Sequence, residues 1–266
     1  MARDRLADDP GAMVHDLRTI LDGWEYEPGK ISVRKIIGCD GREKIQTRVD
    51  LGLLQLELTG RPDGQRPDGF PSMLDRCISR RRDHATQHGS TESYRLTADE
   101  CRELRHEAHL VYQRFLSLFV LEDFDGVARD TDRNLQLFDL CRDHGANEHD
   151  RTALEPQRSY VIMMNTRANA YAASRAGRHE DAVRHVERGI QRISEVEAVT
   201  GDDTPAGEAP EMQVLEALRS ELFQAMPADA LPRVRYELQL ALEDENYELA
   251  ARLRDQLARL QSTDAA

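Results

Sequence analysis

The chain has 266 residues, enough for one large domain or two small ones, and its 39% hydrophobic and 32% charged residues are typical of a soluble, charge-rich helical protein. Its net charge of −13 disfavours direct nucleic-acid binding, because contacts with phosphates need a positive surface. The start of the chain lacks the apolar segment of a secretory signal, and no apolar run approaches the roughly 18 residues of a membrane span. We therefore expect a cytoplasmic protein with no membrane contact, and its 4 widely separated cysteines fit that reducing compartment.

The N-terminal region predicts a short helix followed by a β-hairpin. Residues 10–23 carry apolar side chains at helical spacing, and the segment after them is the most β-like of the chain. Apolar runs flank Asp40 and Gly41, a pair that favours a hairpin turn. On the return strand, the residues expected to share one face are Ile45, Thr47, Val49 and Leu51. After Gly52 the apolar residues move from odd-numbered to even-numbered positions. A strand with a period of two cannot change its apolar face in this way without an extra residue, so we expect a bulge or break at Gly52.

From residue 71 onward the sequence predicts helices. They cover approximately residues 71–84, 97–119, 125–143, 158–176, 179–196 and 212–226. Thr97 and Glu100 form a capping box that begins the second of them. The pair around Gly177 resembles one tetratricopeptide-type repeat, with Ala182 and Gly189 at matching offsets. A plain antiparallel bundle explains the pattern equally well, because a repeat array usually needs about three copies.

No catalytic signature is present, and the residue groups that resemble sites have simpler explanations. His106 and His109 are three residues apart, whereas the metalloprotease helix needs a spacing of four. Four arginines offer a contact for a phosphate or an acidic partner, although a solvated helix face is the favoured explanation: Arg76, Arg80, Arg81 and Arg82. Four carboxylates leave an unrecognised enzyme site open as an alternative: Asp40, Asp50, Asp63 and Asp68. We expect no enzyme activity, no cofactor and no metal site, and we expect Trp24 to pack against the β-hairpin.

The end of the chain predicts a helical hairpin. Pro232 suits the first turn of a helix, and residues 244–246 interrupt the apolar pattern to form a turn. The apolar stripe of the first helix contains Val234, Leu238, Ala241 and Leu242. The seam of the second helix contains Ala250, Leu253, Leu257 and Leu260, at alternating spacings of three and four. Because about 30 residues bury too little surface to be stable alone, the hairpin must dock on the rest of the chain, on a copy of itself or on a partner.

This hairpin resembles the UVR motif, a helical hairpin found in two proteins of the bacterial excinuclease, at the end of one and within the other. The residues that carry the resemblance are Leu238, Leu242, Tyr247, Glu248, Ala250, Ala251, Leu253, Arg254, Asp255, Leu257 and Leu260. The resemblance implies a protein–protein contact, often with another UVR hairpin. Tyr247, Ala250, Leu253 and Leu257 would line the packing seam, and Arg254 and Asp255 would orient or contact the partner. Residues 48–69 also resemble a family of bacterial proteins that end in a UVR motif, which implies a bacterial origin but no activity.

The predicted fold is mainly α, with an N-terminal β-hairpin, a TPR-like antiparallel helical body and the C-terminal UVR helical hairpin. The expected division is 1–70, 71–199, an acidic linker at 200–211, and 212–266 with the UVR motif at about 232–260. The leading hypothesis is a non-enzymatic adaptor that binds another protein, which could itself carry a UVR motif, or that forms a homodimer. A second hypothesis is an accessory factor of nucleotide-excision DNA repair recruited by excinuclease.

Overall fold

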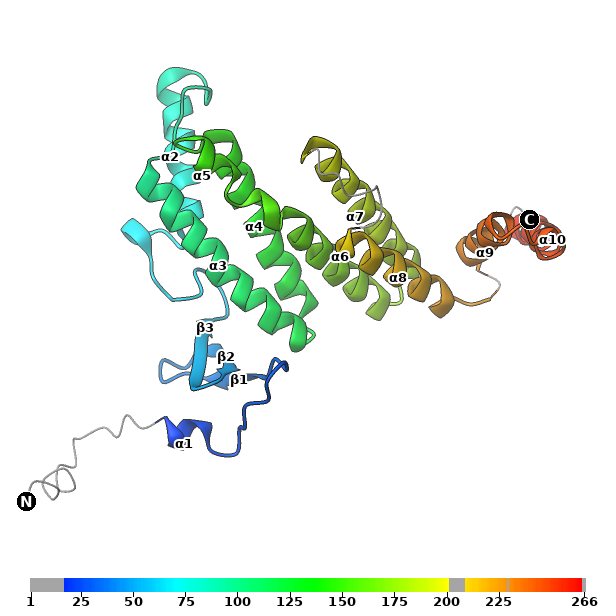
Figure 1. Ribbon diagram of the computed structural model, residues 1–266, viewed down its shortest axis with the longest axis horizontal. Coiled ribbons are helices and arrows are strands. Elements are labelled where there is room, and N and C mark those ends of the chain that lie inside the picture. The colour runs from blue at the N-terminus through cyan, green and yellow to red at the C-terminus, as the bar shows by residue number, and fades with distance from the viewer. Residues whose placement is uncertain (1–16, 201–208, 229, 265–266) are drawn as a thin grey trace, which may run out of the picture.

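The computed structural model describes residues 17–200, 209–228 and 230–264, and it confirms a mainly α fold (Figure 1). The elements in chain order are α1 (Arg18–Leu21), β1 (Val33–Ile37), β2 (Glu43–Val49), β3 (Gly52–Glu57), the 3₁₀ turn η1 (Pro67–Gly69), α2 (Met73–His88), α3 (Ala98–Val120), α4 (Phe124–His144), α5 (Glu148–Thr152), the 3₁₀ turn η2 (Glu155–Gln157), α6 (Arg158–Arg175), α7 (His179–Thr200), α8 (Pro210–Ala225), α9 (Leu231–Glu243) and α10 (Tyr247–Asp264). Most of the helix predicted at 10–23 lies outside the described residues, and α1 is its described part. Within the described residues, no helix is both long and apolar enough to cross a membrane.

The N-terminal sheet has three antiparallel strands in the order β1-β2-β3. The sequence predicted the hairpin of the first two strands but not the third strand. Val49 pairs with Gly52, which makes the break predicted at Gly52 a second tight turn. Leu51 was expected on the same face as Ile45, but it lies in this turn and is 88% exposed. The expectation was wrong because β2 ends at Val49, and the period-2 pattern does not extend through a turn.

Trp24 packs on the sheet, as the sequence predicted. Its indole Nε1 donates a hydrogen bond to the Ser32 hydroxyl at 2.6 Å. The Arg34 guanidinium lies 4.1 Å from the centre of the indole ring, and Arg34 also donates to Gln46 on the neighbouring strand. The segment before β1 therefore covers one face of the sheet through a cation–π contact and hydrogen bonds.

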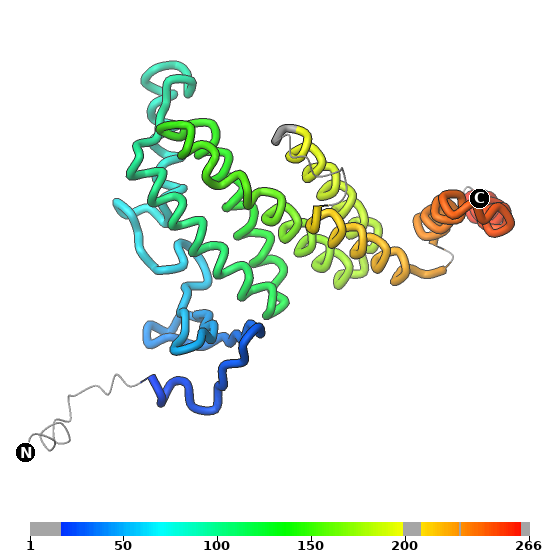
Figure 2. Tube along the Cα trace, in the orientation of Figure 1, coloured from blue at the N-terminus to red at the C-terminus, as the bar shows by residue number. Residues whose placement is uncertain are grey.

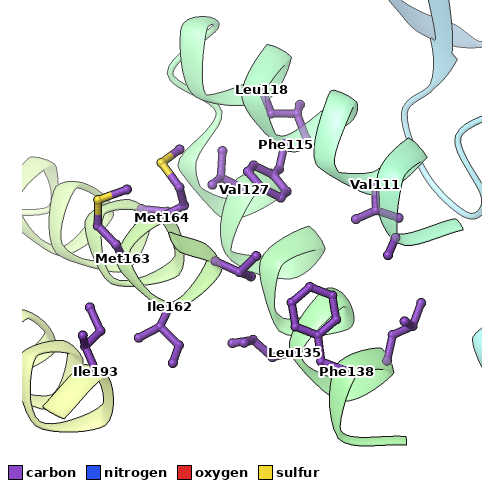
Figure 3. Close-up of a cluster of buried hydrophobic side chains, with 14 of the residues drawn as sticks. Val111, Phe115, Leu118, Val127, Leu135, Phe138, Ile162, Met163, Met164 and Ile193 are labelled. Atoms are coloured by element: carbon purple, nitrogen blue, oxygen red, sulfur yellow. The ribbon is translucent and has the colours of Figure 1, made fainter. Parts of the chain in front are cut away.

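The helical body is a stack of antiparallel helices in which α3 packs on α4, α4 on α6, α6 on α7, and α7 on α8. Its core contains side chains from each of these helices, among them Phe115, Phe138, Ile193 and Leu215, and Figure 3 shows part of this cluster. Gly177 takes a left-handed φ of 72° in the turn between α6 and α7, a conformation that glycine adopts without strain. A Cβ on Gly189 would lie 2.2 Å from the Thr166 hydroxyl, so the absence of a side chain lets α6 and α7 approach closely.

A buried ion pair connects the sheet to the body. Arg114 of α3 and Asp130 of α4 are almost fully buried, and two guanidinium nitrogens donate to the carboxylate at 2.6 and 2.9 Å. A third nitrogen of Arg114 donates to the carbonyl oxygens of Glu57 and Gly60, at and just beyond the end of β3. One side chain therefore satisfies two carbonyl groups of the sheet region, and a carboxylate of α4 balances its charge.

The C-terminal hairpin has its own small core, separate from that of the body. The main core continues through α8 and includes Met226, whereas the second cluster comes entirely from α9 and α10. Figure 2 shows these two helices, in orange and red, at the end of the molecule away from the sheet. By packing, α8 is part of the body, although the domain division expected from the sequence groups it with the terminal helices.

Candidate protein-interaction site

The terminal hairpin forms as its sequence predicts. Pro232 occupies the first turn of α9, where its missing N–H is not needed. The turn at residues 244–246 contains Glu245 in a left-handed conformation with a φ of 54°. Asn246 then caps the next helix, because its side-chain oxygen accepts a hydrogen bond from the backbone N–H of Leu249 at 3.2 Å.

The two helices are held together by a narrow apolar seam. Its fully buried members are Val234, Ala241, Ala250 and Leu253, with Leu238, Leu249, Leu257 and Leu260 partly buried around them. Small residues on both sides, Ala241 and Ala250, let the helix axes approach closely. The buried seam residues therefore stabilise the hairpin itself.

Two apolar residues expected on the stripe or seam lie outside it. Leu242 is 52% exposed and Tyr247 is 67% exposed, on either side of the connecting turn. Ala251 and Arg254 follow Tyr247 at spacings of four and seven, so helical periodicity places them in one stripe, and both are exposed. These four exposed residues, Leu242 just before the turn and Tyr247, Ala251 and Arg254 after it, are together called the tip face below.

The charged residues of the motif are also exposed. Glu248 pairs weakly with Arg252, at 3.9 Å and with both side chains in solvent. The Arg254 guanidinium and the Asp255 carboxylate lie 2.9 Å apart. Exposed pairs of this kind contribute about 0–1 kcal/mol, so these groups can exchange their contacts for those of a partner at little cost in stability.

Tyr236 attaches the hairpin to the body. Its ring stacks on Phe223 of α8 with centroids 4.0 Å apart and planes 9° from parallel, and its hydroxyl lies 2.9 Å from the Ser220 hydroxyl. Arg233 adds hydrogen bonds from one guanidinium nitrogen to the carbonyl oxygens of Gln224 and Met226. Tyr236 was not among the residues expected from the sequence, although an aromatic residue outside the apolar stripe of α9 signals a second contact.

Two of the four arginines of the predicted cluster form ion pairs within the protein. Arg76 pairs with Asp68 at 2.6 Å and with Glu100 at 3.1 Å, and Arg80 also pairs with Glu100. Among the residues that the structure describes, no carboxylate lies within ion-pair distance of Arg81 or Arg82. Only these last two arginines of the cluster therefore keep a charge that is open to an anion.

The structure separates two of the four candidate carboxylates and pairs the other two with arginines. Asp40 and Asp50 lie beyond opposite ends of β2, whose seven residues span roughly 20 Å. Asp40 pairs with Arg42, whose backbone and side-chain N–H groups hold the pKa of this carboxyl well below its ordinary value. Asp63 and Asp68 each pair with a neighbouring arginine, at 3.0 and 2.6 Å. Asp40 and Asp50 therefore do not share one site.

Within the described ranges, no three His, Cys, Asp or Glu side chains are placed to hold a metal ion. Three of the cysteines, Cys77, Cys101 and Cys141, are buried in the body. Burial raises the pKa of Cys77 to about 11 and that of Cys141 to about 12, so both thiols stay protonated at neutral pH.

The hairpin matches a known family. Residues 229–263 match the UVR family, described as the UvrB/uvrC motif, which confirms the resemblance seen in the sequence. No curated protein and no solved structure gives a significant match to the chain. The motif indicates a role in protein interaction or in excinuclease-related DNA repair, and it makes a protein partner plausible.

Proposed function

We propose that this protein is a non-enzymatic adaptor that binds a partner protein through the tip face of its UVR hairpin. The observation that carries the proposal is the division of the motif into two sets of residues. Val234, Ala241, Ala250 and Leu253 are buried within the hairpin, whereas Leu242 and Tyr247 are exposed. Exposed large aromatic and aliphatic side chains, and arginines such as Arg254 on the stripe of Tyr247, are the residue types that anchor protein interfaces.

The partner can be a protein with its own UVR motif or a second copy of this chain. A hairpin held to the body mainly through Tyr236 and Arg233 leaves the tip face clear of the body. In a symmetric dimer, the same face of each chain would meet its copy. The separation of Asp40 from Asp50 by the length of β2 supports the non-enzymatic part of the proposal.

Capture experiments with full-length variants test the tip face. The variant Leu242→Glu/Tyr247→Glu places two charges on the proposed contact, and Leu51→Glu is the matched control because Leu51 is 88% exposed in the sheet. We expect the double variant to reduce partner capture from a native lysate by about tenfold or more, in line with the loss of one interface hot spot. Circular dichroism should show unchanged helicity in both variants. Equal capture by the double variant and the control would rule out the tip face.

A second candidate function is recruitment by excinuclease in DNA repair, and the description of the matched motif favours it. The purified UvrB and UvrC proteins, each titrated with the full-length chain, provide the direct test. Micromolar or tighter binding that the Leu242→Glu/Tyr247→Glu variant loses would support this function. Absence of binding to both proteins would exclude it and leave the adaptor proposal standing with another partner.

A further inference from the structure

A polar cavity lies between the C-terminal half of α2 and the segment that leads from α2 to α3. Its volume is about 450 Å³, which is within the range of small-molecule sites. Side chains of α2 line one wall, and residues 93–95 line the other. The lining is mostly charged or polar, so imperfect packing of the apolar core does not explain the cavity. It is far from the UVR hairpin, at the other end of the molecule (Figure 1), and is therefore separate from the tip face.

Hydrogen bonds between the two walls fix their relative position. The Ser93 hydroxyl lies 2.9 Å from Nε2 of His84. The Tyr94 hydroxyl donates to the backbone carbonyl oxygen of Cys77 at 3.2 Å. Because the later residue of the segment meets the earlier turn of α2, the segment runs back along the helix. Arg95, the next residue, therefore lies toward the end of the cavity that is nearer the start of α2.

The cavity has positive charge that the protein does not balance. One guanidinium nitrogen of Arg95 donates to the carbonyl oxygens of Glu92 and Tyr94, each at 2.7 Å, which holds this group at the cavity. Within the part of the chain that the structure describes, no carboxylate lies within ion-pair distance of Arg95 or of Arg81 on α2. Burial, and after it the charge of Arg81, lowers the pKa of His144, whose ring meets that of Tyr94. The field of these arginines therefore reaches the residues behind the cavity wall.

The lining groups suit a phosphate monoester that carries hydroxyl groups. Arg80 pairs with Glu100 through one terminal nitrogen, and its other N–H groups remain for a ligand. A phosphate monoester can bind the guanidinium groups of Arg80 and Arg95 together, because it has three terminal oxygens and nearly two negative charges at neutral pH. Asp83 and Gln87, four residues apart on α2, add oxygens that accept hydrogen bonds from hydroxyl groups. Asp83 would repel an anion without such a group, so its presence favours a hydroxylated ligand.

We propose that this cavity binds a free sugar phosphate, with the phosphate held by Arg80 and Arg95 and a sugar hydroxyl donating to Asp83. A phosphorylated side chain of a protein carries the same phosphate, but it brings no hydroxyl group to Asp83. The net charge of −13 disfavours a nucleic acid as the ligand, because its other phosphates would be repelled by the rest of the surface. The protein would thus bind a small molecule in its body and a partner protein through its hairpin.

Isothermal titration calorimetry with the full-length protein tests the proposal. The probes are glucose 6-phosphate, methyl phosphate, glucose and a short peptide with one phosphoserine. We expect saturable binding of glucose 6-phosphate and about tenfold weaker binding of methyl phosphate, which lacks hydroxyl groups. Arg95→Gln should weaken the binding of glucose 6-phosphate by about tenfold or more, the effect of losing a hydrogen bond to a charged group. In Asp83→Ala, the preference for glucose 6-phosphate over methyl phosphate should fall by about threefold or more.

Arg82→Gln is the matched control, because it removes an exposed positive charge from the same helix without changing the lining of the cavity. It should bind glucose 6-phosphate within about twofold of the wild type, since solvent screens the charge of an exposed side chain. If thermal melting shows that Arg95→Gln does not fold, Arg80→Gln replaces it, and Glu100 then keeps its ion pair with Arg76.

Four results would overturn the proposal. They are no saturable binding of glucose 6-phosphate, equal weakening by Arg82→Gln and Arg95→Gln, an unchanged preference over methyl phosphate in Asp83→Ala, and tighter binding of the phosphoserine peptide or of glucose than of glucose 6-phosphate. Tighter binding of the peptide would assign the site to a phosphorylated partner instead. The tip-face variants keep every residue of this cavity, so the two proposals fail separately.

Discussion

The small core of the hairpin predicts a local, not a global, response to the substitution Leu253→Ala. Leu253 is 6% exposed and belongs to the cluster formed only by α9 and α10. The other buried residues of that cluster are Val234 and two alanines, so Leu253 is its largest buried side chain. Removing the leucine side chain costs about 2–5 kcal/mol in a buried site. The hairpin has few other buried contacts to offset that loss.

Hydrogen exchange measured by mass spectrometry separates the hairpin from the body. A loss of about 2 kcal/mol or more corresponds to roughly 30-fold faster exchange of amides that open with the hairpin. We expect this acceleration throughout α9 and α10, with α3, α4 and α6 unchanged. Leu242→Ala is the matched control, because its side chain is 52% exposed and its removal should change stability by less than about 0.5 kcal/mol.

Equal acceleration in the body helices would contradict a local response. It would mean that the hairpin and the body unfold together, and that the stack of Tyr236 on Phe223 couples the two cores strongly. Unchanged exchange in α9 and α10 would contradict it as well, because Leu253 would then contribute nothing to the seam.

Three further predictions concern the rest of the fold. Asp130→Ala leaves the buried Arg114 charge uncompensated, and we expect the free energy of unfolding, measured in urea, to fall by about 3–5 kcal/mol. A fall of less than about 1 kcal/mol would show that the buried ion pair does not stabilise the fold. Tyr236→Phe removes the hydrogen-bond partner of Ser220 but keeps the ring, so it should cost only about 1 kcal/mol in the same assay, and a larger loss would give the hydroxyl a greater role than the structure does. Burial lowers the pKa of His144 in the folded chain, so the unfolded chain binds a proton at this residue first as the pH falls below about 6.5. The urea midpoint should therefore fall as the pH falls below this value, and it should fall less in the His144→Asn variant. Equal falls in the two proteins would exclude His144 as a cause of the pH dependence.

Local sequence signals predicted many elements of the fold because their causes are local. The capping box of Thr97 and Glu100 begins α3, Pro232 lies in the first turn of α9, and residues 244–246 form the turn of the hairpin. Each of these signals acts through hydrogen bonds or dihedral angles within a few residues, so it does not depend on the rest of the chain. The second turn of the sheet was predicted only as an irregularity at Gly52, because parity shows that a strand must change but does not show how.

Periodicity and a specific residue pattern were enough to predict a mainly helical chain that ends in a UVR hairpin. Which motif residues face inward became clear only from the packing of α9 on α10. Leu253 is buried and Tyr247 exposed, although the resemblance to the UVR motif implied one seam for both. Likewise, the rings of Tyr112 and Tyr160 come from different helices, and their contact depends on how both helices pack on α4. Both cases have the same cause: helical periodicity fixes which residues share a face, and tertiary packing selects which face is covered.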